Sequence, residues 1–218
     1  MNNDIFSPLE SLPYFTIEAV RQLIDQESAA AGSLPTHLYR WVKAGKLIRL
    51  KKGVYMSRRF FEAHRADADF APAVSMILIP QSYVSLEYVL QRHGIVGEVT
   101  QALSAVTFKQ TRVIENRMGV FAYRHIKPGL YQGFEIADYL GIPFAMASAA
   151  KALFDALYLR PLGLPSQSRS FHLAEDLRLN LDEFPSEAQA QFAYFVETSQ
   201  SSKMQRILEN LRRTVWRH

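Results

Sequence analysis

The sequence predicts an α+β protein in which a small N-terminal unit of helices and one hairpin precedes a larger mixed domain. Three observations predict this arrangement. Within the first 60 residues, segments with helical apolar spacing precede two short β-prone runs joined by a glycine-containing turn. From about residue 74 strand-like segments gather, and helix-like segments dominate after residue 145. The 218 residues, 48% of them hydrophobic, suffice for two domains, which we predict at 1–66 and 67–218.

Two short helices open the chain. The first covers about Ile5–Leu12, and Pro13 ends it because the proline ring cannot continue a helix. Thr16 is suited to cap a second helix over Ile17–Gln26, whose apolar residues recur at helical spacing.

A third helix is expected after a connection of small residues, Ser28–Gly32. We place this helix at about Pro35–Ala44, because proline fits a first helical turn and Gly45 fits a C-terminal stop.

A tight hairpin is expected next. The runs Leu47–Leu50 and Val54–Met56 flank Lys51 and Lys52, with Gly53 at the turn. Helix, connection, helix and hairpin in this order are typical of a winged helix-turn-helix.

The third helix divides into a polar and an apolar face when its residues are plotted at about 100° each. The outward arc carries Thr36, His37, Tyr39, Arg40 and Lys43, and the opposite arc carries Leu34, Leu38, Trp41 and Val42. The outward side chains are of the kinds that reach base edges and phosphates, and none is acidic. We predict that this arc, together with Arg49, Lys51 and Lys52 of the hairpin, binds double-stranded DNA.

The charge distribution agrees with a phosphate-rich partner. Between Ser28 and Phe61 there is no Asp or Glu, and eight Lys and Arg residues give this segment a charge of +8. The rest of the chain carries 17 basic and 21 acidic residues, a charge of −4. Such a concentration of positive charge favours nucleic acid, the alternative being a basic face that is merely solvated.

The larger domain is predicted to follow a linker over Ser57–Pro72 and to contain a small sheet and several C-terminal helices. The expected strands are Val74–Ile79, Leu103–Phe108, Arg112–Glu115, Gly119–Ile126 and a strand near Gly133–Ile136. The expected helices are Ser82–His93, Ala145–Leu159, Phe171–Leu181, Ser186–Thr198 and Lys203–Arg217.

Catalytic and metal-binding signatures are not found in the sequence. There is no cysteine, no phosphate-binding glycine loop, no H-E-x-x-H, no G-x-S-x-G, and no histidine pair at ligand spacing. Lys151 and Asp155, four residues apart, are interpreted as a surface ion pair. We therefore expect no enzyme, metal or cofactor. The apolar run Ile142–Leu159 is too interrupted for a membrane span and there is no signal peptide, so a cytoplasmic protein is expected.

The ordered motifs of the chain resemble those of the AbiEi-type antitoxins of type IV toxin–antitoxin systems. In the N-terminal unit the resemblance rests on Tyr39-Arg40-Trp41, Gly45 to Arg49 and Gly53-Val54-Tyr55. In the larger domain it rests on Tyr83 to Glu87, His93-Gly94-Ile95, Val106-Thr107, Gly119 to Phe121, Tyr123 to Ile126, Gly133-Phe134, Ala147, Lys151 to Leu153, Asp155 and Tyr158. Where the family usually has Pro-Glu before the lysine, this chain has Ala149-Ala150, so no role is carried over for that glutamate.

The resemblance implies a DNA-binding repressor of its own operon whose C-terminal domain counteracts a nucleotidyltransferase-like toxin. It makes Tyr123, Arg124, His125 and Lys151 candidates for binding a partner, the alternative being core polar contacts and strand pairs. Two other functions stay open: a stand-alone regulator whose C-terminal domain binds a ligand or another protein, and an enzyme that uses the winged helix only for docking.

Overall fold

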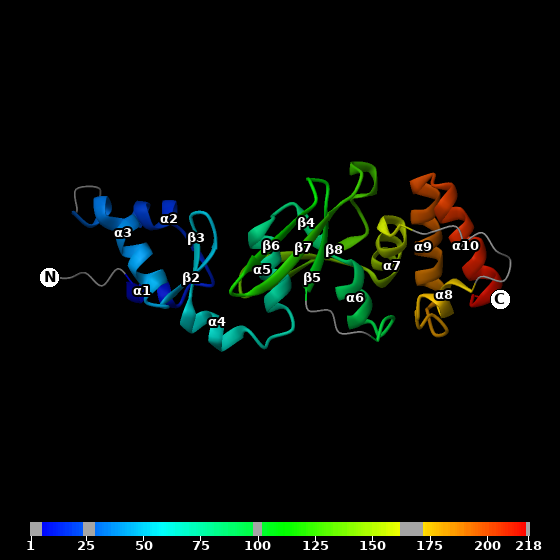
Figure 1. Cartoon of the computed structure of the whole chain (residues 1–218), viewed down its shortest axis with the longest axis horizontal. Helices are drawn as coiled ribbons and strands as arrows, with labels where there is room; N and C mark the ends of the chain where they lie inside the picture. The colour runs from blue at the N-terminus through cyan, green and yellow to red at the C-terminus, as the bar shows by residue number, and fades with distance from the viewer. Residues whose placement is uncertain (1–5, 24–28, 98–101, 162–171, 217–218) are drawn as a thin grey trace.

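The N-terminal unit has the predicted winged-helix order in the computed structural model, which describes residues 6–23, 29–97, 102–161 and 172–216 (Figure 1). Its elements are α1 (Phe6–Glu10), β1 (Phe15–Thr16), α2 (Ile17–Leu23), α3 (Ala29–Lys43), β2 (Leu47–Lys51) and β3 (Val54–Ser57). The three strands form an antiparallel sheet in the order β1-β3-β2. The predicted α+β class with an N-terminal winged helix is confirmed.

The helix boundaries follow from local chemistry. Thr16 caps α2 as predicted, because its hydroxyl oxygen accepts a hydrogen bond of 3.0 Å from the Ala19 amide. The predicted end of this helix at Gln26 and the start of the connection at Ser28 lie outside the described residues. Gly45, at φ +72°, ends α3, and the amide of Lys46 donates to the Trp41 carbonyl over 2.9 Å.

The start of α3 differs from the prediction. The helix begins at Ala29, and Pro35 lies inside it. The predicted small-residue connection over Ala29–Gly32 is therefore wrong, because alanine has the highest helix propensity and successive alanines favour a helical turn. Pro35 leaves one backbone hydrogen bond of the helix unmade.

Two helices occupy the segment between the hairpin and the large sheet. The predicted linker folds into α4 (Arg58–His64), capped by Ser57, whose hydroxyl oxygen accepts from the Phe60 amide at 3.0 Å. The predicted strand Val74–Ile79 is wrong, because Val74–Leu78 belong to α5 (Phe70–Leu78) and Ile79 is its C-cap. A short apolar run does not distinguish a buried strand from a buried helix, and most of α5 is buried.

The large sheet is mixed and has the order β6-β7-β5-β4-β9-β8. Its strands are β4 (Ser82–Val84), β5 (Ala102–Thr107), β6 (Arg112–Asn116), β7 (Gly119–His125), β8 (Phe134–Tyr139) and β9 (Ile142–Ala147), and a 3-10 turn, η1 (Pro128–Leu130), follows β7. The predictions of β5 to β8 are confirmed. Those for Ser82–Val84 and Ala145–Ala147 are wrong, because these residues form strands where we expected the starts of helices.

Helices cover both faces of this sheet. Tyr123 of β7 bonds to Ser75 of α5, whereas Ser104 of β5 accepts from the amide of Tyr88 in α6 (Leu86–Arg92). Successive side chains along a strand alternate between the two faces of the sheet. Ser104 pairs with Ala122 and shares its face, so Tyr123, the next residue, lies on the opposite face. Thus α5 covers one face and α6 the other, where α7 (Ala149–Leu159) packs beside α6.

The last helices extend the α7 side of the molecule. They are α8 (Leu173–Asp176), α9 (Ser186–Ser199) and α10 (Ser202–Thr214). Figure 1 shows α9 and α10 side by side beyond α7. The predictions of α9 and α10 are confirmed. The helix predicted over Phe171–Leu181 is limited to α8, and Phe171 and Arg217 lie outside the described residues.

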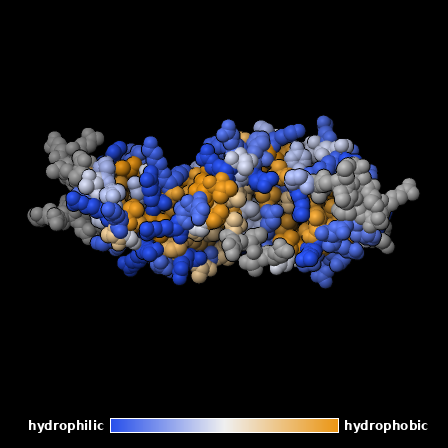
Figure 2. Space-filling model, in the orientation of Figure 1, coloured by the Kyte–Doolittle hydropathy of each residue, from blue (hydrophilic) through white to orange (hydrophobic). Residues whose placement is uncertain are grey.

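Two apolar clusters meet at the hairpin. The smaller one contains buried side chains of α1, α2 and α3 together with Phe15 of β1 and Leu47 of β2. The larger one fills both sides of the large sheet and also takes in four hairpin residues, Ile48, Leu50, Val54 and Met56. The outline of the molecule narrows at this junction (Figure 2), but the hairpin packs against both parts.

Candidate nucleic-acid interface

Helix α3 has the two faces that its sequence predicts. Leu34 and Leu38 are only 1% exposed, and Trp41 and Val42 are half-buried against the same cluster. On the other side Thr36, Tyr39, Arg40 and Lys43 are exposed, and His37 is half-buried. The predicted division is confirmed, and its DNA-binding role stays a prediction.

Arg40 stands free at the centre of the exposed face. Within the described ranges its guanidinium has neither an ion pair nor a hydrogen bond, so its donors are available to a ligand. Lys43 lies with its ammonium 5.5 Å from the ring centroid of Tyr39, a cation–π contact. The rings of His37 and Trp41 lie 5.9 Å apart, which restrains His37 at the edge of this face.

The hairpin adds charge next to α3. Arg49 is exposed on β2, where it pairs with Tyr55 of β3, and its neighbours Ile48 and Leu50 are buried. Lys52 is exposed at the turn, where Gly53 adopts φ +76°. A side chain at Gly53 would lie 3.9 Å from the carboxylate oxygens of Glu18. Glu18 of α2 therefore comes close to the turn, a tertiary contact that local sequence did not indicate.

Lys51 has a different environment from Lys52. Its ammonium donates to the Leu78 carbonyl at the end of α5 over 3.3 Å. Burial and the nearby ammonium of Lys109 lower the pKa of Lys51 below its ordinary value. The hairpin turn thus approaches the end of α5, which the sequence did not predict.

The candidate partner-binding residues of the second domain separate into two pairs. Tyr123 and Lys151 are completely buried, whereas Arg124 and His125 are exposed. The Tyr123 hydroxyl donates to the Ser75 carbonyl at 2.9 Å and accepts from the Ser75 hydroxyl at 3.1 Å. Of the four candidates, only Arg124 and His125 are accessible to a partner.

The buried pair of Lys151 and Asp155 corrects the sequence interpretation. Both side chains are 0% exposed, and the Lys151 ammonium lies 2.5 Å from Asp155 Oδ1. The hydroxyls of Tyr83 and Ser85 donate to Asp155 Oδ2 over 2.9 and 2.8 Å. The predicted surface ion pair is therefore wrong. Helix α7 is apolar on nearly all sides of this pair, which is the sequence signal that predicts burial.

Burial destabilises the charged forms of Lys151 and Asp155, whereas their mutual attraction stabilises those forms. Burial raises the pKa of Asp155, and the Lys151 ammonium and the two hydroxyls act against that rise. Burial likewise lowers the pKa of Lys151, against the attraction of Asp155. The Lys151 ammonium also lies over the rings of Tyr83, Phe154 and Phe195 at 4.9–5.6 Å. Tyr83, Ser85, Lys151 and Asp155, which belong to the motifs of the C-terminal resemblance, thus converge in the core.

The described residues contain no group of His, Asp and Glu side chains that could hold a metal ion. None of the helices in the described ranges combines the length and apolarity needed to span a bilayer.

Residues 10–58 match the sequence model of a family described as transcriptional regulator, AbiEi antitoxin. The match spans β1 to β3 and includes the whole candidate interface of α3 and the hairpin. A comparison with curated proteins gave no match. The resemblance to AbiEi-type antitoxins is confirmed for this N-terminal segment.

Proposed function

We propose that this chain, whose N-terminal segment is that of AbiEi antitoxin regulators, binds double-stranded DNA through α3 and the β2–β3 hairpin and represses its own operon. The observation that carries the proposal is the acid-free outer face of α3, beside a basic hairpin in a segment of charge +8. Exposed cations gathered on one face favour a polyanion, because neutralised phosphates release their counterions.

Each exposed side chain has a role in this proposal. Arg40 reads a guanine edge with two hydrogen bonds, because its side chain is exposed and central on the outer face of the helix. Thr36 and His37, nearer the start of that face, contact neighbouring bases. Lys43 and Tyr39 contact phosphates one turn later, and Arg49 and Lys52 bind the backbone beside the hairpin.

The second part of the proposal concerns the larger domain. We infer that it counteracts a nucleotidyltransferase-like toxin in the cytoplasm, directly or indirectly, with Arg124 and His125 as accessible contacts. The family match ends at residue 58, and this supports the alternative that the larger domain of a stand-alone regulator binds a ligand or another protein. Co-expression with the neighbouring gene distinguishes the two: rescue of growth supports the antitoxin, and unchanged toxicity supports the alternative.

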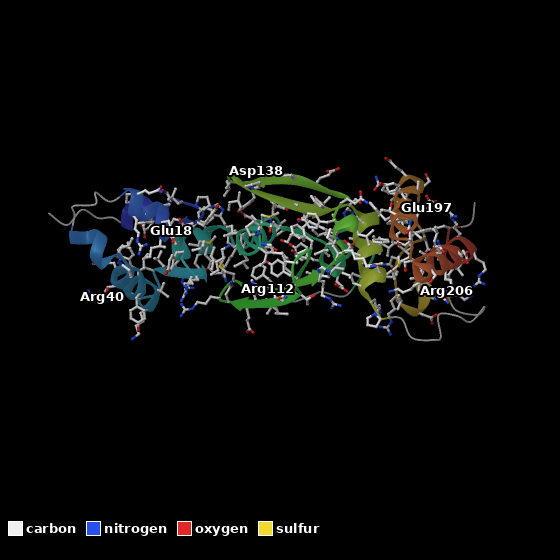
Figure 3. All side chains as sticks on the ribbon, turned by 90° about the horizontal axis from the view of Figure 1, so that it is seen from above. Glu18, Arg40, Arg112, Asp138, Glu197 and Arg206 are labelled. Atoms are coloured by element: carbon white, nitrogen blue, oxygen red, sulfur yellow. The ribbon has the colours of Figure 1, made fainter. Side chains whose placement is uncertain are left out.

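The DNA-binding proposal is tested on Arg40. Arg40→Ala is expected to weaken binding to the duplex upstream of its own gene by roughly 1–3 kcal/mol and to affect a scrambled duplex much less. Arg206→Ala, on exposed α10 at the far end of the chain (Figure 3), removes the same charge and serves as the control. If Arg40→Ala binds both duplexes like the parent protein at fixed salt, α3 does not read the sequence.

A further inference from the structure

A cleft with three cations lies where the hairpin turn meets the second domain. Its volume is about 350 Å³, and its wall combines the end of α5 with the start of β6 and the loop before it. Lys51, Lys109 and Arg112 line it, and no Asp or Glu is among its described lining residues. Three cations therefore converge on one small space without a counter-charge.

The sheet geometry keeps the nearest acid of β6 away from this cleft. Arg112 pairs with Tyr123, and both lie on the α5 side of the sheet. Asn116 is on the same side, because its amide nitrogen lies 3.5 Å from the Leu50 carbonyl of the hairpin. The side chain of Glu115, one residue before Asn116 on β6, therefore lies on the opposite side of the sheet.

The three cations of the cleft repel one another, and a bound anion would offset this repulsion. Burial and then the nearby ammonium of Lys109 lower the pKa of Lys51, and no Asp or Glu is among the described residues that line the cleft. A phosphate in the cleft would supply the missing counter-charge and accept charge-assisted hydrogen bonds from all three side chains.

The lining favours a phosphate over a whole nucleotide. Its one aromatic residue, Tyr123, is completely buried, and its hydroxyl is bonded to Ser75. The described lining thus offers no ring on which a base could stack. In Figure 3 Arg40 and Arg112 lie along the same long side of the molecule, and Asp138 lies on the opposite side. This shared side favours a phosphate of the DNA that α3 binds over a free phosphate.

We propose that this cleft binds a backbone phosphate of the same duplex that α3 contacts, so that the footprint continues past the hairpin onto the second domain. The inference rests on the proposed function and adds to it a contact made by Lys109 and Arg112. Lys51 then joins the two halves of the footprint, because it is part of both the hairpin and the cleft.

The test compares the double variant Lys109→Gln/Arg112→Gln with the full-length parent on two duplexes. One duplex ends at the hairpin contact, and the other continues by one helical turn on the side of the second domain. On the long duplex the double variant is expected to lower the slope of log K against log salt by about 1 unit for each phosphate that it no longer neutralises. On the short duplex it is expected to match the parent. Arg206→Gln/Arg212→Gln, exposed on α10, removes two charges as a control.

Three results would overturn the inference. The first is a parent-like salt slope of the double variant on the long duplex. The second is binding of inorganic phosphate that the double variant abolishes while its DNA binding is unchanged, which would make the cleft a site for a small anion. The third is a parent protein that binds neither duplex, which would also overturn the proposed function. If the double variant matches the parent while Arg40→Ala loses sequence preference, the proposed function stands and only the cleft fails.

Discussion

Replacing Lys151 by methionine should destabilise the protein far more than the same change at a surface lysine or arginine. Methionine has a similar shape but leaves Asp155 buried without its cation, and breaking one partner of a buried ion pair costs about 3–5 kcal/mol. Lys151 and Asp155 are each 0% exposed, so solvent does not replace the missing partner. For a chain of this size that destabilisation corresponds to a drop in Tm of roughly 6–20 °C.

The destabilisation should depend on pH in a defined direction. Burial raises the pKa of Asp155 in the folded state, and removing Lys151 removes the main opposing interaction. The folded variant therefore holds a proton on Asp155 that the unfolded chain, with an ordinary Asp pKa of about 3.9, has released. Consequently the stability of the variant falls as pH rises above about 4, and its deficit against the parent is larger at pH 8 than at pH 4.5.

The assay is urea denaturation followed by circular dichroism at both pH values. Arg58→Met is the matched control, because Arg58 and Glu62 have the same spacing of four residues but are 45% and 46% exposed, with a separation of 3.5 Å. That exposed pair should change stability by less than about 1 kcal/mol. A Lys151→Met variant as stable as the Arg58→Met control at pH 8 would refute the reasoning.

Two further predictions concern stability. Trp41→Ala should cost less than the roughly 3–5 kcal/mol of a fully buried tryptophan, because Trp41 is only half-buried. It should also cost less than Leu38→Ala, because Leu38 is 1% exposed; the order of the two denaturation midpoints checks this. Gly133→Ala should destabilise the second domain, because Gly133 has φ +79° and an added methyl would lie 2.5 Å from the Phe195 ring. A Tm for Gly133→Ala equal to that of the parent would contradict this packing, and Gly97→Ala, where the space is open, is the control.

The N-terminal unit was predictable because its signals are local. Thr16, Gly45 and Gly53 each determine the backbone within a few residues, and the helical spacing around Leu34 and Leu38 separates the faces of α3 without knowledge of the rest of the chain. The exposed side chains of the candidate interface follow from the same spacing.

Two of the errors arose where long-range packing decides the structure. The run over Val74–Ile79 has the same composition as a buried strand, and it is helical because α5 packs across the large sheet. Lys151 and Asp155 have the spacing of a surface ion pair, and they are buried because α9 packs on α7 and Tyr83 of β4 bonds to Asp155. Neither α9 nor β4 is adjacent to α7 in sequence, so local spacing could not reveal that the ion pair is buried.

The hairpin has a consequence for how this architecture can change during evolution. Its residues Ile48, Leu50, Val54 and Met56 belong to the same apolar cluster as the large sheet, while Leu47 belongs to the N-terminal cluster. A recombination that joined residues 1–66 to an unrelated domain would remove the residues beyond 66 from this cluster and expose apolar surface, and a contiguous exposed apolar patch favours aggregation. The regulator segment can therefore be inherited only with a partner domain that fits this surface, so the two halves are expected to diverge together rather than as exchangeable modules.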